Sequence, residues 1–290
     1  MKINIKKPNF LSLIFVVSLT LTFAGEQTPE ERPISALYLT GGYYHDYSEQ
    51  AKIIPPSIDL YSSKKINWTI INQIEKQNKM ESDFYKSPNW YKNFDVIVHN
   101  ICFANLRDDD YVASILQAHQ YGVPAMLIHC AMHSFRKVSN TKEWHQCCGA
   151  HSPNHGPKHP FEIKVVNPKH EIMRGYENWT TPAGELYFVK EAFPNMTTLA
   201  ESKSNKTGKM HPTVWVNDYG PNHARVFGTT IGHHTETILQ PEYMELITRG
   251  FLWAKGISVE KNLNFNKTKI NNSKSHNLSI GNYVKFNNKI

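Results

Sequence analysis

Four short segments in the first half of the chain centre on apolar, often β-branched residues and are bounded by polar or turn residues, although the one at 66–74 also contains polar positions. Runs of this length that are apolar throughout are typical of strands buried on both faces of a sheet. The first run leads directly into Gly41 and Gly42, which indicates a loop at its carboxyl end. The predicted strands cover residues 34–40, 66–74, 95–100 and 123–129.

Segments with helical periodicity lie between and after these runs. In 107–122 the apolar residues share one helical face, acidic residues occupy the first turn, and Gly122 can end the helix. A second helix is expected to begin at 48–54 with Ser48 as its N-cap, and a closing helix is predicted at 242–256. Strands that alternate with helices at this spacing predict a parallel α/β sheet.

The second half of the chain has a looser pattern. The segment 149–160, rich in glycine, proline and histidine, predicts a loop whose histidines are expected at the surface. No internal repeat is present. We expect one domain, at 34–256, to contain every informative motif. Further strands are predicted at 161–166, 197–202, 212–218 and 224–230.

Both ends of the chain differ from this domain. Residues 1–24 combine a basic start, an apolar run and small residues at the cleavage spacing, which is typical of a secretory signal peptide. A membrane anchor is the alternative, but the run is short for a span of roughly 20 residues. A polar linker at 25–33 and an asparagine- and lysine-rich tail at 257–290 flank the domain. The sequence therefore predicts a periplasmic or secreted protein with no stable membrane insertion after cleavage.

The formal net charge of +7 lies mostly outside the predicted domain. Residues 257–290 hold six lysines and one glutamate, a net +5, and 1–33 carry a net +1, which leaves +1 for 34–256. Nucleic-acid binding would need basic residues clustered on the folded surface. A nearly neutral domain argues against a nucleic-acid partner.

Export also bears on the four cysteines. An oxidising compartment permits disulfides, but four cysteines allow three full pairings, and the sequence does not choose among them. The neighbours Cys147 and Cys148 are poor partners for each other because a bridge between them would be strained. Buried or unpaired thiols are at least as compatible with the sequence.

Reactive side chains follow three of the predicted strands. His45 comes after the first strand, Cys102 after the third, and His129 and Cys130 after the fourth. In open α/β sheets, ligands bind outside the carboxyl ends of the strands. These residues are therefore expected to meet at one rim, where a site would lie.

The predicted rim contains candidate metal ligands. His129 and His133 are four residues apart, so a helix that began there would point both in the same direction. Together with His233 and Glu185, they offer imidazoles and a carboxylate that suit a divalent metal such as zinc or manganese. A hydrogen-bonded polar cluster without metal is an equally good interpretation of these residues.

Other residues are candidates for proton transfer or substrate contact. His45 and Asp46 could form an acid–base pair, and Asp46 could also cap the following helix. Cys130 resembles a nucleophile at a strand end but lacks the small residues that a tight elbow usually needs. No dinucleotide fingerprint is present, so no nucleotide cofactor is expected. Side chains that suit sugar binding are Arg136, Tyr187 and Trp144, with core packing as the alternative for the aromatic ones.

Several segments together carry a family resemblance. The chain contains, in order, GGYYHDY, LIHCAMHSF, TPAGELY, HPTVW, RVFGTTIGHHTET and RGFLWAKG. In this combination it resembles the ThuA-like (trehalose utilisation) family over nearly all of 34–256. The resemblance implies a three-layer α/β/α sandwich that is flavodoxin-like and of the class I glutamine amidotransferase-like type, without the glutaminase triad. It also implies catabolism of trehalose and related disaccharides through keto-sugar intermediates.

The resemblance also places seven residues in a pocket, and these suggest a reaction. We expect a metal-assisted enzyme that acts on a keto-sugar or keto-disaccharide by isomerisation or hydrolysis. His45, Asp46 and His234 would move protons. A non-catalytic carbohydrate-binding protein is the alternative, and a cysteine hydrolase using Cys130 is a weaker one; a homo-oligomer is left open. The implied pocket residues are His45, Asp46, His129, His133, Glu185, His233 and His234.

Overall fold

The computed structural model of the chain describes residues 32–73 and 83–264. The predicted signal peptide at 1–24, most of the predicted linker and the tail beyond residue 264 lie outside these described residues.

Strands and helices alternate through the first half of the described chain, and strands dominate the second. The strands of the main sheet are β1 (Ile34–Gly42), β2 (Ile66–Gln73), β3 (Val96–Cys102), β4 (Ala125–Ile128), β6 (Glu162–Val165), β7 (Trp179–Thr180), β9 (Thr197–Lys203), β10 (Met210–Tyr219) and β11 (Ala224–Thr229). A separate pair consists of β5 (Ala150–His151) and β8 (Glu191–Ala192). The helices are α1 (Tyr47–Tyr61), α2 (Asp109–Gln120), α3 (Thr141–Cys148), α4 (Thr235–Ile238), α5 (Pro241–Lys255) and α6 (Val259–Asn262). Short 3₁₀ helices are η1 (Asp83–Lys86), η2 (Trp90–Asn93) and η3 (His129–His133).

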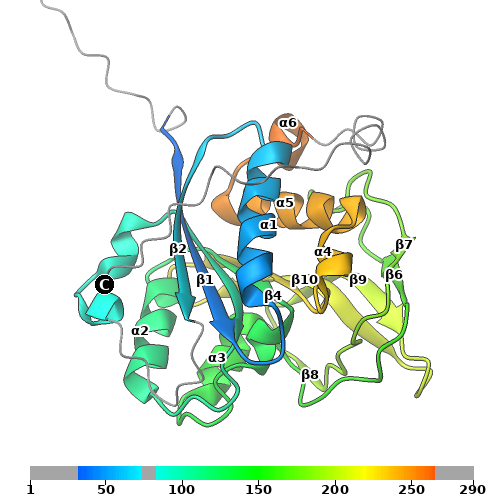
Figure 1. Ribbon diagram of the computed structural model, residues 1–290, viewed down its shortest axis with the longest axis horizontal. Coiled ribbons are helices and arrows are strands. Elements are labelled where there is room, and N and C mark those ends of the chain that lie inside the picture. Colours follow the sequence, from blue (N-terminus) through cyan, green and yellow to red (C-terminus); the bar gives the residue numbers. More distant parts are fainter. Residues whose placement is uncertain (1–31, 74–82, 265–290) are drawn as a thin grey trace, which may run out of the picture. The chain divides into compact units, whose positions relative to one another are not determined.

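The main sheet has nine strands in the order β2-β1-β3-β4-β11-β10-β9-β6-β7 (Figure 1). The pairs from β2 to β11 are parallel, and those from β11 to β7 are antiparallel. The parallel α/β sheet predicted from the sequence is confirmed, and the second half of the chain extends it with antiparallel strands.

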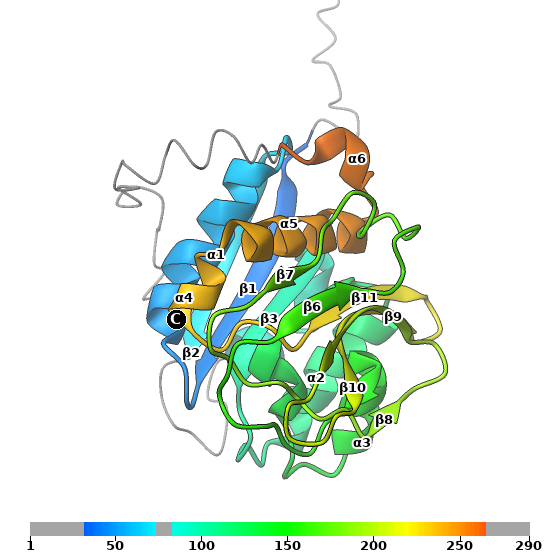
Figure 2. The same ribbon diagram turned by 90° about the vertical axis from the view of Figure 1, so that its right-hand side faces the viewer.

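Helices cover both faces of this sheet and make three layers (Figure 2). Helices α1 and α5 pack on one face, and α2 and α3 on the other. The side chains of β1 alternate accordingly: Ala36 and Tyr38 join the core on the α1 side, and Leu37 and Leu39 join the core on the α2 side. The three-layer α/β/α sandwich is thus confirmed.

Local details differ from the sequence-based expectations. The N-cap of α1 is Asp46 rather than Ser48, because the Asp46 carboxylate accepts a hydrogen bond from the backbone N–H of Glu49 at 3.0 Å. Helix α3 was not predicted, since its only buried residues are Trp144, Cys147 and Cys148 and these are too few to give a periodic pattern.

The described body also extends beyond residue 256, where the sequence suggested that the tail begins. The backbone N–H of Ser63 donates to the carbonyl of Asn262, and that of Asn264 donates to the carbonyl of Tyr61. Val259 is buried against the domain. Residues 257–264 therefore pack as part of the folded body.

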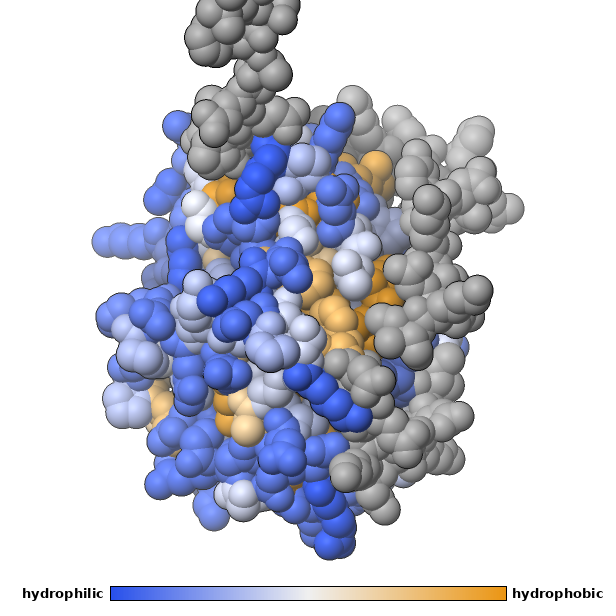
Figure 3. Space-filling view, turned by 90° about the vertical axis from the view of Figure 1, so that its left-hand side faces the viewer, coloured by the Kyte–Doolittle hydropathy of each residue, from blue (hydrophilic) through white to orange (hydrophobic). Residues whose placement is uncertain are grey.

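None of the helices in the described part of the chain is long and apolar enough to cross a membrane. From the side on which β2 forms the edge of the sheet, the surface is mostly hydrophilic, with hydrophobic residues showing in separate places (Figure 3). Tyr44, 76% exposed, is the most exposed large hydrophobic residue among the described positions.

A pair of buried histidines joins β3 to α2. Nδ1 of His119 donates to the backbone carbonyl of Val123 at 2.8 Å, so its Nε2 is free to accept the Nε2–H of His99 at 2.9 Å. Both rings are therefore neutral. Burial lowers the pKa of His119 to about 4, and burial with the nearby His119 holds the pKa of His99 well below its usual value.

This pair makes folding stability depend on pH. The pKa of His119 is lower in the folded protein than in the unfolded chain, where it is about 6.5, so below that pH the unfolded chain binds more protons. The stabilisation is therefore complete above pH 6.5 and falls as the pH drops toward 4. We expect wild type to lose about 2 kcal/mol more than His119→Leu between pH 7 and pH 5, measured by urea unfolding at both values.

Ile115→Val is the matched control in the same helix. It should lower the free energy of unfolding by about 1 kcal/mol equally at both pH values, because it removes a buried methylene but no titrating group. An unchanged pH dependence in His119→Leu would contradict the neutral pair.

Candidate functional site

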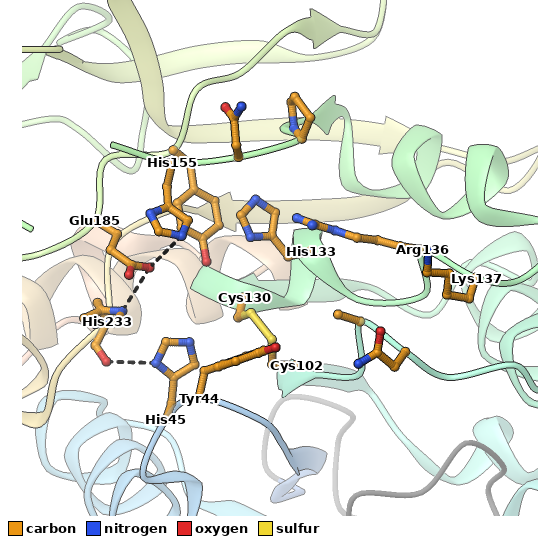
Figure 4. Close-up of a pocket in the computed structure, with 15 residues that line it drawn as sticks. Tyr44, His45, Cys102, Cys130, His133, Arg136, Lys137, His155, Glu185 and His233 are labelled. Atoms are coloured by element: carbon orange, nitrogen blue, oxygen red, sulfur yellow. Dashed lines mark hydrogen bonds and ion pairs between the residues drawn. A yellow bond between two sulfur atoms is a disulfide. The ribbon is translucent and has the colours of Figure 1, made fainter. Parts of the chain in front are cut away.

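A pocket of about 570 Å³ opens at the carboxyl ends of β1, β3 and β4 (Figure 4). This volume is in the range of small-molecule sites. In the close-up, Glu185, His233 and His45 line one side, Arg136 and Lys137 line the opposite side, and His133 lies between them.

Two histidines beside the pocket have fixed tautomers. Nδ1 of His45 lies 3.2 Å from the backbone carbonyl of His233, and Nδ1 of His129 lies 2.6 Å from that of Thr230. Because a carbonyl can only accept, both Nδ1 atoms carry the hydrogen. The Nε2 atoms of both rings are therefore left with a lone pair.

A carboxylate and a third histidine complete this cluster. Oε2 of Glu185 lies 3.2 Å from Nδ1 of His233 and 3.9 Å from Nε2 of His129. Nε2 of His129 lies 3.3 Å from Nδ1 of His233, and it accepts the hydroxyl hydrogen of Tyr187 at 3.2 Å. One ring nitrogen from each of His45, His129 and His233 lies within 4.8 Å of the other two, an arrangement that can hold a metal ion.

The surroundings favour uncharged rings and a charged carboxylate. Burial and the neighbouring His233 lower the pKa of His45 to about 4, and burial and His45 hold the pKa of His129 far below its usual value. Burial by itself would raise the pKa of Glu185. The hydrogen bond and charge of His233 lower this pKa and outweigh burial, so the net shift is downward. At neutral pH the cluster offers the neutral rings of His45 and His129 next to the negative charge of Glu185.

The turn after β4 decides which residue faces the cluster. His129 has a left-handed backbone with φ +47°, and it starts the 3₁₀ helix η3 rather than an α-helix. The strained position at this strand end is therefore occupied by His129 and not by Cys130.

His133 was predicted as a metal ligand with His129, but the structure does not place it in the metal-capable group with that residue. A 3₁₀ turn does not align residues four apart as an α-helix does. His133 stacks on the Tyr187 ring at a centroid distance of 3.9 Å and lies outside the metal-capable group, where His45 takes its place.

Three further predicted site residues lie outside the pocket lining. Trp144 is fully buried and donates its indole N–H to the carbonyl of Ala131, so it cannot contact a substrate. Asp46 is exposed and caps α1, and it does not line the pocket. His234 packs beside His233 at a ring distance of 4.0 Å but also lies outside the pocket lining. Arg136 and Tyr187 do line it.

A disulfide lies in the pocket wall. Cys102 at the end of β3 and Cys130 after β4 are bonded to each other, whereas Cys147 and Cys148 are buried and free. Cys130 is therefore not a free thiol, which corrects its reading as a nucleophile.

The sequence missed His155 as a pocket residue. Its loop is attached to the segment that carries Glu185. The backbone N–H of Gly156 donates to the carbonyl of Leu186, and His155 forms an isolated antiparallel β-bridge with Tyr187. Nε2 of His155 lies 3.7 Å from Oε2 of Glu185. Tyr44 and Lys137 were also missed, and nothing in their local pattern marks them.

The disulfide should contribute to stability by closing a loop with a sequence separation of 28 residues. For that loop length, we expect Cys102→Ser/Cys130→Ser to lower the free energy of unfolding by about 3.5 kcal/mol in urea titrations. Unfolded wild type should show two free thiols before reduction and four after it. Four thiols without a reductant would contradict the bridge.

Comparison with known proteins agrees with this architecture. Residues 36–254 match the family model ThuA, described as trehalose utilisation. A ThuA-like protein from Parabacteroides merdae superposes with a TM-score of 0.63 and 20% identity, covering 78% of this chain and 92% of that one. A ThuA-like protein from Bacteroides uniformis gives 0.60 and 17%, covering 78% and 95%. No curated protein matches the chain significantly. The chain belongs to the ThuA (trehalose utilisation) family.

Proposed function

We propose that this protein is a metal-dependent enzyme of carbohydrate catabolism that acts on a keto-sugar or keto-disaccharide by isomerisation or hydrolysis. The observation that carries the proposal is the pair of Nδ1–H hydrogen bonds from His45 and His129 to backbone carbonyls. Histidines that bind metals almost always donate their second ring N–H in this way, which fixes the ring and leaves the other nitrogen for the metal.

The spacing of the donor atoms also fits a metal site. Ligands about 2.0–2.1 Å from a tetrahedral ion lie about 3.3 Å apart from one another. The distance between Nε2 of His129 and Nδ1 of His233 is 3.3 Å, and Oε2 of Glu185 lies 3.2 Å from the latter atom. His45, His129 and His233 would hold the ion, and Glu185 would supply the negative charge beside it.

A divalent ion at this position would polarise a carbonyl oxygen of the bound sugar. The chain's own residues would do the rest. Tyr187 closes the pocket wall, with its ring stacked on that of His133. His155 lines the pocket, reaches solvent and lies beside Glu185, so it can take a proton from the sugar or return one. This gives His155 the proton-transfer role that the sequence suggested for Asp46 and His234.

The family description of trehalose utilisation supports a sugar as the substrate. The signal-like pattern of residues 1–24 supports a site of action in the periplasm or outside the cell.

The metal site is tested by metal content after incubation with zinc or manganese. Wild type should bind about one ion per chain, and His129→Ala and His233→Ala should lose it, because each removes a ligand. Glu185→Gln should weaken binding by about 10–100-fold. His133→Ala is the matched control: it alters a buried histidine of the same turn outside the metal-capable group and should keep its metal. A wild type that binds neither ion would overturn the metal mechanism.

Proton transfer is tested by turnover of keto-sugars. His155→Gln should lower kcat by about 100-fold or more with unchanged metal content, since it removes only the proton-transfer group. His159→Gln, in the same loop but outside the pocket, should behave as wild type. Equal loss in both variants would exclude a specific role for His155.

A further inference from the structure

The side of the pocket opposite the histidine cluster carries two positive charges. Arg136 and Lys137 both line the pocket, and neither forms a hydrogen bond or ion pair with another side chain of the described residues. In the close-up, the Arg136 side chain extends toward His133, across the pocket from Glu185 and His233 (Figure 4).

Among the described residues that line the pocket, Glu185 alone carries a carboxylate, and its Oε2 is already shared between His233 and His155. No other acidic side chain of this described lining balances the two cations. His133 does not add to the charge, because burial and the adjacent Arg136 lower its pKa to about 2. The excess positive charge on this side is therefore that of Arg136 and Lys137.

The backbone holds this segment in place. Phe135 has a left-handed backbone with φ +61°, and its N–H donates to the carbonyl of Phe103 at 3.0 Å. Its fully buried ring packs against Trp144 at a centroid distance of 4.8 Å. Further along, Asp109 accepts hydrogen bonds from the N–H and hydroxyl of Ser139. The chain is thus anchored on both sides of the two cations.

Neutral groups that suit a sugar surround the cations. Asn105 and Asn154 add amide donors and acceptors to the lining. Tyr44 also lines the pocket with a 76% exposed ring, and its left-handed backbone, φ +77°, is costly for a residue other than glycine. An exposed ring at a pocket mouth can stack on the face of a sugar.

We propose that Arg136 and Lys137 form an oxyanion subsite and that the natural substrate is an anionic saccharide, carrying a carboxylate or a phosphate. The planar guanidinium of Arg136 can bind either group through two parallel hydrogen bonds, and Lys137 adds a point charge. This inference rests on the proposed function, because both place the sugar in the same pocket. Trehalose itself is uncharged, so the subsite would distinguish this chain's substrate from it.

The test is calorimetric binding to the full chain after treatment with a chelator, so that an added anion has no metal to coordinate. Glucuronate and glucose 6-phosphate are the anionic probes, and glucose is the neutral one. At least one anionic sugar should bind 10-fold or more tightly than glucose, and the preference should shrink as salt is raised. Which of the two binds better decides between carboxylate and phosphate.

Substitutions test whether the preference for anionic sugars comes from Arg136 and Lys137. Arg136→Gln should remove most of it and Lys137→Gln a smaller part. Arg107→Gln, an exposed arginine outside the pocket with the same change in net charge, should keep it. Thermal unfolding of each variant checks that it is folded. Equal affinity for neutral and anionic sugars, or an unchanged preference in Arg136→Gln, would overturn the subsite.

Failure of the subsite and failure of the metal mechanism are separable. The first is judged from sugar binding without metal, and the second from metal content without sugar. A protein that binds metal but shows no anion preference would keep the proposed function and lose only this inference.

Discussion

The site depends on one constraint, the common direction of four neighbouring strands. Strands β1, β3, β4 and β11 are hydrogen-bonded in parallel, so their carboxyl ends meet at one edge of the sheet. His45, His129 and His233 follow those ends and Cys102 is the last residue of β3, so the shared strand direction brings segments far apart in the sequence to one rim. The segments that carry His155, Glu185 and Tyr187 line the pocket at this edge.

Burial then sets the chemistry of the cluster. Rings that leave water must keep their hydrogen-bonding groups satisfied, and the nearest acceptors for His45 and His129 are backbone carbonyls. That requirement fixes the hydrogens on Nδ1, and burial keeps the rings neutral. The same pocket is electrically uneven, with a carboxylate among histidines on one side and two cations on the other. An asymmetric ligand would be oriented by such a field.

Backbone strain gathers at the same rim. Tyr44, His129 and Phe135 all adopt positive φ values, and each follows or flanks a strand end beside the pocket. Such conformations cost about 1–3 kcal/mol each and persist only where packing determines them. Here the packing of Phe135 against Trp144 and the bridge between Cys102 and Cys130 hold the neighbouring backbone.

The sequence by itself determined the parallel sheet and the strand ends at which chemistry collects, because uninterrupted apolar runs and helical periodicity are local properties. It also identified His129, His233, Glu185 and Arg136, which line or adjoin the pocket. Tertiary structure decided their grouping. His45 replaced His133 beside His129 because η3 is a 3₁₀ turn that starts from a left-handed residue, and no spacing rule reports that. Trp144 lies in the core and His155 lines the pocket for the same reason. Contacts between segments distant in sequence decide which face a short helix buries and which strand a loop pairs with.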